Sequence, residues 1–189
     1  NEVDLQTWEM VHYRNGEMYY NMGDFDKAIE QFHGYVERCD NRMYKKREFR
    51  EMALEFMAIS FSDMPNGAEE ATKFFKRIGS KPYEAQVLYT IGLKNRLHGQ
   101  WEDAIKSLQT ALKRFPYYKN APIGRQALIE CFVVKKEHEK ANEERVKLVD
   151  DYGPGSAWYS KNQGEKAVIE QSRNEIRKAI ASIAIYYHA

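Results

Sequence analysis

The chain has 189 residues, of which 43% are hydrophobic and 30% are charged, with a formal net charge of +1. This balance is typical of a globular domain with a substantial core. Near-neutral charge argues against a nucleic-acid groove, which needs an excess of Lys and Arg on one face. A mean hydropathy of −0.73 and the lack of any apolar run of about 18 residues argue against a membrane-spanning helix.

Two segments, residues 16–32 and 92–116, share a spaced pattern of small residues and aromatics. In the first segment, Gly16 stands where a neighbouring helix approaches closely, Gly23 makes a turn between two helices, and Ala28 lies where those helices cross. The second segment has the same roles in the same order at Gly92, Gly99 and Ala104. This pattern resembles the tetratricopeptide repeat, a helix–turn–helix unit of about 34 residues.

The resemblance implies an all-α fold: a right-handed α-solenoid of helix pairs that forms one domain over residues 1–189, with a long C-terminal helix. The spacing of the small residues predicts four pairs, at roughly 9–42, 43–80, 83–116 and 121–152. The fourth pair departs furthest from the family pattern. Ile129 stands at its small position, and Arg145 replaces the usual second-helix aromatic.

Helix breakers follow the fourth pair. Residues 153–156, Gly-Pro-Gly-Ser, end it and supply a capping serine. A short helix is predicted over 156–163 and a long one with an apolar stripe over 165–188. Ala184 and Tyr187 have the spacing of a first repeat helix, so the long helix is either a cap or half of a fifth repeat. Apolar residues on several of its faces favour the half repeat, and a homodimer through this helix would bury the second face.

The sequence lacks the motifs of common enzymes. It contains no G-x-S-x-G elbow, no phosphate-binding glycine loop, no H-E-x-x-H pair and no C-x2-C. The five histidines are spread along the chain, so their spacing predicts no metal site. Cys39 and Cys131 fall in the first and fourth pairs, too far apart for a disulfide, and are predicted to be free thiols. We therefore predict no catalytic residue, no metal and no cofactor.

Binding is better supported than catalysis. In a right-handed stack of helix pairs the first helices line the concave inner face, and counting from each small position predicts which side chains point inward. These partner-binding candidates are Tyr13, Glu17, Tyr20, Phe56, Ile59, Tyr89, Leu93, Arg96, Gln126, Glu130 and Val133. Aromatic and arginine side chains anchor many interfaces, so this face suits an extended or helical peptide with apolar anchors. The alternative is that several of the aromatics only pack between adjacent pairs.

These features predict a non-catalytic interaction scaffold with a protein or peptide partner. The joints at 115–118 and 152–156 are similar to those of bacterial cell-envelope repeat proteins, namely the outer-membrane-protein assembly lipoproteins and the coordinator of the Tol–Pal system. That likeness implies envelope assembly and a periplasmic location, with the cytoplasm as the alternative. Because the sequence begins without a methionine, the second interpretation is a regulatory or substrate-presenting domain of a larger enzyme or signalling protein.

Overall fold

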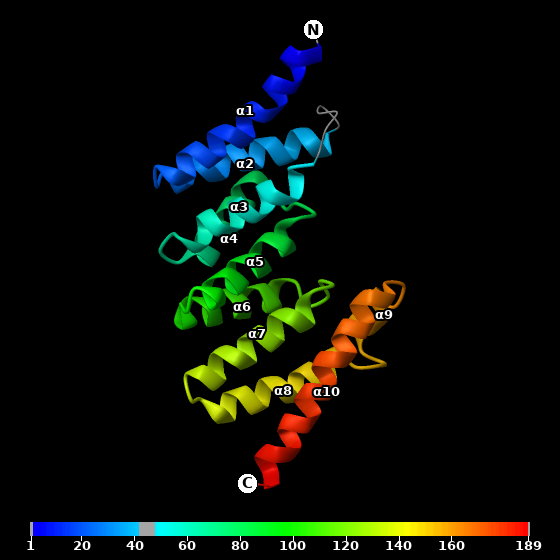
Figure 1. Ribbon diagram of the computed structural model, residues 1–189. Helices are drawn as coiled ribbons and strands as arrows, with labels where there is room; N and C mark the ends of the chain where they lie inside the picture. The colour runs from blue at the N-terminus through cyan, green and yellow to red at the C-terminus, as the bar shows by residue number, and fades with distance from the viewer. Residues whose placement is uncertain (1, 42–47, 189) are drawn as a thin grey trace. The chain divides into compact units, whose positions relative to one another are not determined.

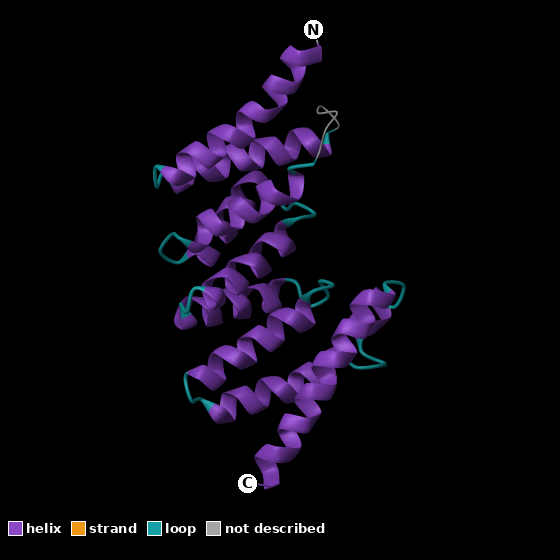
Figure 2. Ribbon diagram, in the orientation of Figure 1, coloured by secondary structure: helices purple, strands orange, loops and turns teal. Residues whose placement is uncertain are grey.

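The computed structural model describes residues 2–41 and 48–188; for residues 2–9 and 188 it describes the backbone only. In this part of the chain every regular element is an α-helix, and ten helices follow one another in sequential pairs, with a long helix at the C-terminal end (Figures 1 and 2). The predicted all-α fold is confirmed. The helices group into two compact units: unit one ends at Ile91, and unit two begins at Gly92.

Unit one is a run of helices in which each of the first four contacts its neighbour in the chain. Its elements are α1 (Glu2–Asn21), α2 (Phe25–Asp40), α3 (Arg50–Ser62), α4 (Gly67–Ile78) and the first part of α5 (Glu84–Leu97). Helix α1 packs on α2, α2 on α3, and α3 on α4. The predicted boundary between the first two repeats, at residues 42–43, lies outside the described residues.

Unit two continues this arrangement and ends with two further helices. Its elements are the last part of α5, α6 (Trp101–Arg114), α7 (Ala121–Val134), α8 (His138–Tyr152), α9 (Ala157–Asn162) and α10 (Lys166–His188). Helix α6 packs on α7 and α7 on α8, while α10 lies against α7, α8 and α9. The short helix expected over 156–163 and the long helix expected over 165–188 are both present.

Two buried glycines set how closely the paired helices approach. A Cβ atom on Gly16 would lie 2.6 Å from the ring of Phe32, and one on Gly92 would lie 2.6 Å from Cγ of Leu108. Interiors are packed too densely to admit such contacts without a shift of the neighbour. Gly23, in the turn after α1, has a φ of +75°, the left-handed conformation that glycine adopts at little cost. These glycines have the roles that the repeat pattern predicts.

The fourth pair, α7 and α8, keeps the buried alanine of the other pairs but has different residue types at other repeat positions. The crossing alanines of all four pairs are 0% exposed: Ala28, Ala71, Ala104 and Ala141. Ile129, at the small position of α7, is 2% exposed, whereas Arg145 on α8 is only partly buried. In the turn between these helices Lys136 has a φ of 61°, where pairs one and three use a glycine. The fourth pair thus keeps the crossing but changes the residues around it.

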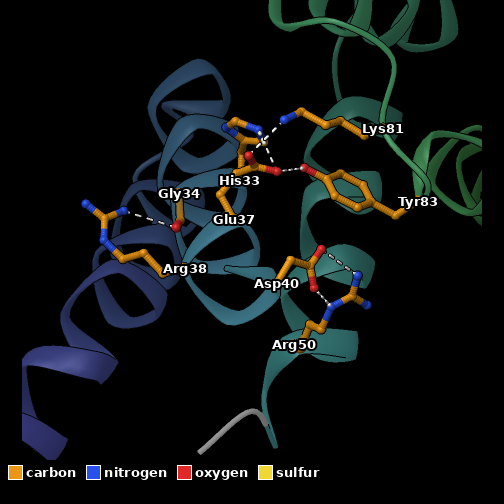
Figure 3. Close-up of polar contacts among 8 residues, drawn as sticks. All are labelled: His33, Gly34, Glu37, Arg38, Asp40, Arg50, Lys81 and Tyr83. Atoms are coloured by element: carbon orange, nitrogen blue, oxygen red, sulfur yellow. Dashed lines mark hydrogen bonds and ion pairs between the residues drawn. The ribbon is translucent and has the colours of Figure 1, made fainter. Parts of the chain in front are cut away.

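A polar cluster joins α2 to the segment after α4 in unit one (Figure 3). Glu37 accepts hydrogen bonds from Lys81 Nζ and Tyr83 Oη, each at 2.8 Å. Burial alone would raise the pKa of Glu37, but these hydrogen bonds outweigh it and the pKa lies below its ordinary value. Burial and the bond to Glu37 raise the pKa of Tyr83, which stays neutral. Nearby, Arg50 donates two hydrogen bonds to Asp40, at 2.6 and 2.9 Å, and so joins α3 to α2.

Helix α9 connects two parts of unit two through the side chain of Trp158. The predicted cap is confirmed, because Ser156 Oγ accepts a hydrogen bond from the backbone N–H of Tyr159 at 3.1 Å. Trp158 Nε1 donates to the backbone carbonyl of Tyr118 at 2.8 Å, and its ring meets that of Tyr152 edge-on at 5.5 Å. Helix α9 therefore holds the loop before α7 close to the end of α8.

Candidate functional site

Two of the predicted partner-binding residues are core residues of unit one. Tyr13 is 1% exposed and Tyr89 is 2% exposed. The ring of Tyr13 lies 5.8 Å from that of Phe32 and 5.7 Å from that of Tyr35, both in edge-to-face geometry. For these two tyrosines the alternative given above applies, because both pack inside the protein. Neither tyrosine offers a surface to a partner.

The other candidates of unit one are partly exposed: Glu17, Tyr20, Phe56 and Ile59. Tyr20 Oη donates to Asp63 Oδ2 at 2.8 Å, which links α1 to the end of α3. Burial and this hydrogen bond raise the pKa of Tyr20. The ring of Phe56 stacks on that of Phe32 at 5.5 Å. These contacts hold the side chains in place within unit one and leave part of each accessible.

Four predicted residues converge on a pocket of unit two: Arg96, Gln126, Glu130 and Val133. The pocket has a volume of about 380 Å³. Arg96 comes from α5, and the other three lie along α7, so they fall on one face of that helix. Leu93 is partly exposed but does not line this pocket.

Three polar side chains of the pocket are hydrogen-bonded to one another. Arg96 Nη1 donates to Glu130 Oε2 at 2.6 Å, and Gln126 Nε2 donates to Glu130 Oε1 at 3.2 Å. The Nε atom of Arg96 is buried and has no hydrogen-bond partner among the described residues. Arg145, on the α8 side, makes no ion pair within the described part of the chain. The pocket thus combines one engaged carboxylate with the guanidinium group of Arg145, which remains available.

Sequence reasoning missed more than half of the residues that line the pocket. The missed residues are Trp101, Ile129, Val134, Arg145, Lys178, Ala179 and Ser182. The last three lie on α10, which contacts α7, and the repeat pattern does not predict where a helix beyond the last pair will pack. Arg145 did carry a signal: it stands at a position where the repeat normally has an aromatic side chain.

Other kinds of site find no geometric support. Among the side chains that the structure describes, those of residues 10–41 and 48–187, no three of His, Cys, Asp or Glu lie where they could hold a metal ion. Cys39 and Cys131 are both buried, and no disulfide joins them. Burial raises the pKa of the Cys131 thiol to about 11, so this sulfur is a poor nucleophile near neutral pH.

Over the same residues, no helix combines the length and the apolar character that a membrane crossing requires.

Comparison with known proteins gives one family match and one relative. Residues 86–116 match the Tetratricopeptide repeat family. The Regulatory protein RapG of Bacillus subtilis (strain 168) is 26% identical over 138 residues, which cover 68% of this chain and 37% of that protein. The chain therefore spans little more than a third of the length of this relative. No solved structure was found to match the chain.

These matches decide between some of the expectations drawn from the sequence. The family match covers most of α5 and all of α6, which form the third predicted repeat. Neither match supports the envelope location that the joints at 115–118 and 152–156 implied. The comparisons identify residues 86–116 as a tetratricopeptide repeat, a unit of protein interaction, in a chain that is distantly similar to a bacterial regulatory protein.

Proposed function

We propose that this chain is a non-catalytic regulatory domain that binds a segment of a partner protein in the pocket of unit two. One observation carries the proposal: four residues predicted to face a partner, from two helices, line one pocket together with α10. A partner-binding face is the established use of repeats of this kind.

The size and lining of the pocket favour a peptide segment as the ligand. A volume of about 380 Å³ accommodates one or two side chains rather than a folded domain. Val133 and Ile129 give it an apolar wall, while Arg96 and Glu130 form a polar rim. An apolar centre within a polar rim is the usual anatomy of an interface that holds an anchor side chain.

The regulatory part of the proposal rests on the similarity to a protein described as regulatory. Since the chain spans 37% of that protein, it corresponds to a part of it rather than to the whole. A domain of this kind regulates by engaging or releasing its partner. We prefer this interpretation to envelope assembly, because only the former has a matching relative.

A peptide-display selection on the purified chain tests the proposal. Peptides that are enriched on the wild type are synthesised and titrated by calorimetry against Val133→Glu and Val146→Glu. The two valines are 39% and 38% exposed and lie on α7 and α8, but only Val133 lines the pocket. We expect Val133→Glu to weaken binding at least about tenfold, because it places a charge on the apolar wall, and Val146→Glu to leave binding unchanged.

Circular dichroism of both variants shows whether they remain folded. Equal binding by wild type and Val133→Glu, or a loss confined to Val146→Glu, would place the partner elsewhere and reject this function.

A further inference from the structure

The fourth helix pair differs from the repeat pattern at two positions, one on each of its helices. In pair one, Gly16 on the first helix faces the ring of Phe32 on the second. In pair four, the first helix carries the large residue, Ile129, which is buried. On the second helix, Arg145 stands at the repeat position where pair one has Phe32, and it lines the pocket.

The charges around the pocket are unequal. Three cations line it, from three different helices: Arg96, Arg145 and Lys178. The single carboxylate among the lining residues, Glu130, is bound by Arg96 at one oxygen and by Gln126 at the other. Lys178 pairs with Glu175 at 3.0 Å, but the Lys178 side chain is 66% exposed, so this pair holds it weakly. A positive charge at Arg145 is therefore left without compensation among the described residues.

We propose that this pocket binds the carboxylate of an aspartate or glutamate side chain in the partner segment, with Arg145 as its main contact. The inference deepens the proposed function and rests on it, since the partner segment presents the carboxylate. A guanidinium group binds a carboxylate with two parallel hydrogen bonds, which is the strongest and most directional pairing open to an exposed arginine. The stem of the acidic side chain, or an apolar neighbour, packs on Val133.

A singly charged carboxylate fits better than a phosphorylated side chain. Glu130 stays in the pocket and repels any anion that enters. A phosphate carries a charge of about −1.5 to −2 near neutral pH, so this repulsion is larger for it than for a carboxylate. The free cation of Arg145, assisted by Lys178, balances a single negative charge.

Three short peptides of matched sequence test the inference. They are acetyl-Leu-X-Leu-X-Leu-amide with X as glutamate, glutamine or phosphoserine, so that no terminal charge contributes. Each is titrated by calorimetry against wild type, Arg145→Gln and Arg177→Gln. Arg177 is a matched control because it lies on α10, is 71% exposed and does not line the pocket.

We expect wild type to bind the glutamate peptide at least about tenfold more tightly than the glutamine peptide. Arg145→Gln should abolish that preference, and Arg177→Gln should retain it. Lys178→Gln, on a different helix, provides a second test if Arg145→Gln fails to fold, and should reduce the preference about threefold. Raising the salt concentration should weaken the glutamate peptide more than the glutamine peptide.

Each of the remaining outcomes rejects the carboxylate site, the proposed function or both. Equal affinity for glutamate and glutamine peptides, with both lost in Val133→Glu, overturns the carboxylate site and leaves the proposed function standing. Tighter binding of the phosphoserine peptide than of the glutamate peptide also overturns it, in favour of a phosphate ligand. If display-selected peptides bind but none of these three does, the carboxylate site is again rejected. If nothing binds, both proposals fall.

Discussion

Helix pairs one and four solve the same packing problem in opposite ways. In pair one the second helix supplies the large side chain, Phe32, which is 0% exposed against Gly16. In pair four the first helix supplies it, as Ile129, and the corresponding residue of the second helix, Arg145, is left partly exposed. Each pair thus has a large buried side chain at one of these two positions, on the second helix in pair one and on the first helix in pair four. In pair four the position that holds a core aromatic in pair one carries a partly exposed arginine instead.

Unit one uses its aromatic residues in the core. The ring of Tyr13 lies within 5.1 to 6.4 Å of four others: Phe32, Tyr35, Phe49 and Phe56. Aromatic clusters of this kind bury large areas and add edge-to-face contacts. Unit two, by contrast, places Arg145 and Trp101 around a pocket. Similar helix pairs thus serve stability in one region and a candidate binding site in the other.

The largest expected difference between the two pairs comes from replacing the residue at the same repeat position, Phe32 or Arg145, with alanine. Phe32→Ala should lower the free energy of unfolding by about 3–5 kcal/mol, because a fully buried aromatic leaves a cavity. Arg145→Ala should change it by less than about 0.5 kcal/mol, because that side chain is partly exposed and forms no ion pair among the described residues. Urea unfolding followed by circular dichroism measures both. Equal losses would show that Arg145 is a core residue after all.

The close approach in pair one gives the next largest effect. Gly16→Ala should cost about 1–3 kcal/mol, because the new Cβ would lie 2.6 Å from the ring of Phe32. Gly164→Ala, in the turn before α10, is the control: nothing lies within 4 Å of its Cβ position, and the change should be neutral or slightly stabilising. Thermal unfolding of the two variants provides the measurement. A neutral Gly16→Ala would mean that Phe32 can move aside without loss.

A smaller effect comes from pH and from the polar cluster of unit one (Figure 3). Burial lowers the pKa of His33, whose Nε2 lies 3.8 Å from Glu37 Oε1. Since the unfolded histidine binds a proton at higher pH than the folded one, stability should fall as the pH drops below about 6.5. The depressed pKa of Glu37 gives a second loss below about 4.5. His33→Gln should remove the first loss and Glu37→Gln the second in thermal midpoints recorded from pH 7 to 3; unchanged pH profiles would contradict this.

The smallest expected effect concerns the end of unit two. Ile185 and Tyr187 on α10 are each 70% exposed, next to the partly exposed Ile183. Exposed apolar residues grouped on a helix favour association, so we expect weak, concentration-dependent dimerisation. Sedimentation velocity should detect it in the wild type and not in Ile183→Glu with Tyr187→Glu. A single monomeric species at every concentration would favour α10 as a cap of unit two.

The helix pairs could be predicted from the sequence because their markers are local. Gly16 allows two neighbouring helices to approach closely, and Gly23 forms the turn between them. Both roles concern residues close in the sequence, so the spacing of the glycines is enough to recognise them. The capping role of Ser156 is equally local, because the bond to Tyr159 spans three residues. Long-range placement was harder. The approach of α10 to α7 depends on side-chain packing that no repeat pattern encodes.

The candidate site shows the same division. Arg96, Gln126, Glu130 and Val133 follow from helical periodicity, and they do line one pocket. The same periodicity could not separate them from Tyr13, because it says which face of a helix a residue occupies and not what covers that face. In unit one, neighbouring aromatic rings cover Tyr13.

The sequential packing of the helices has a consequence for how the protein folds. Within each unit the helices mostly touch neighbours in the chain: α1 and α2, α2 and α3, α6 and α7, α7 and α8. Chains dominated by such short-range contacts close small loops and fold quickly. They also lack a single structural element on which all others depend, so unfolding can start at a free end and pass from one pair to the next. We therefore expect one pair to open while the rest stays intact, and hydrogen exchange should show protection that differs from helix to helix.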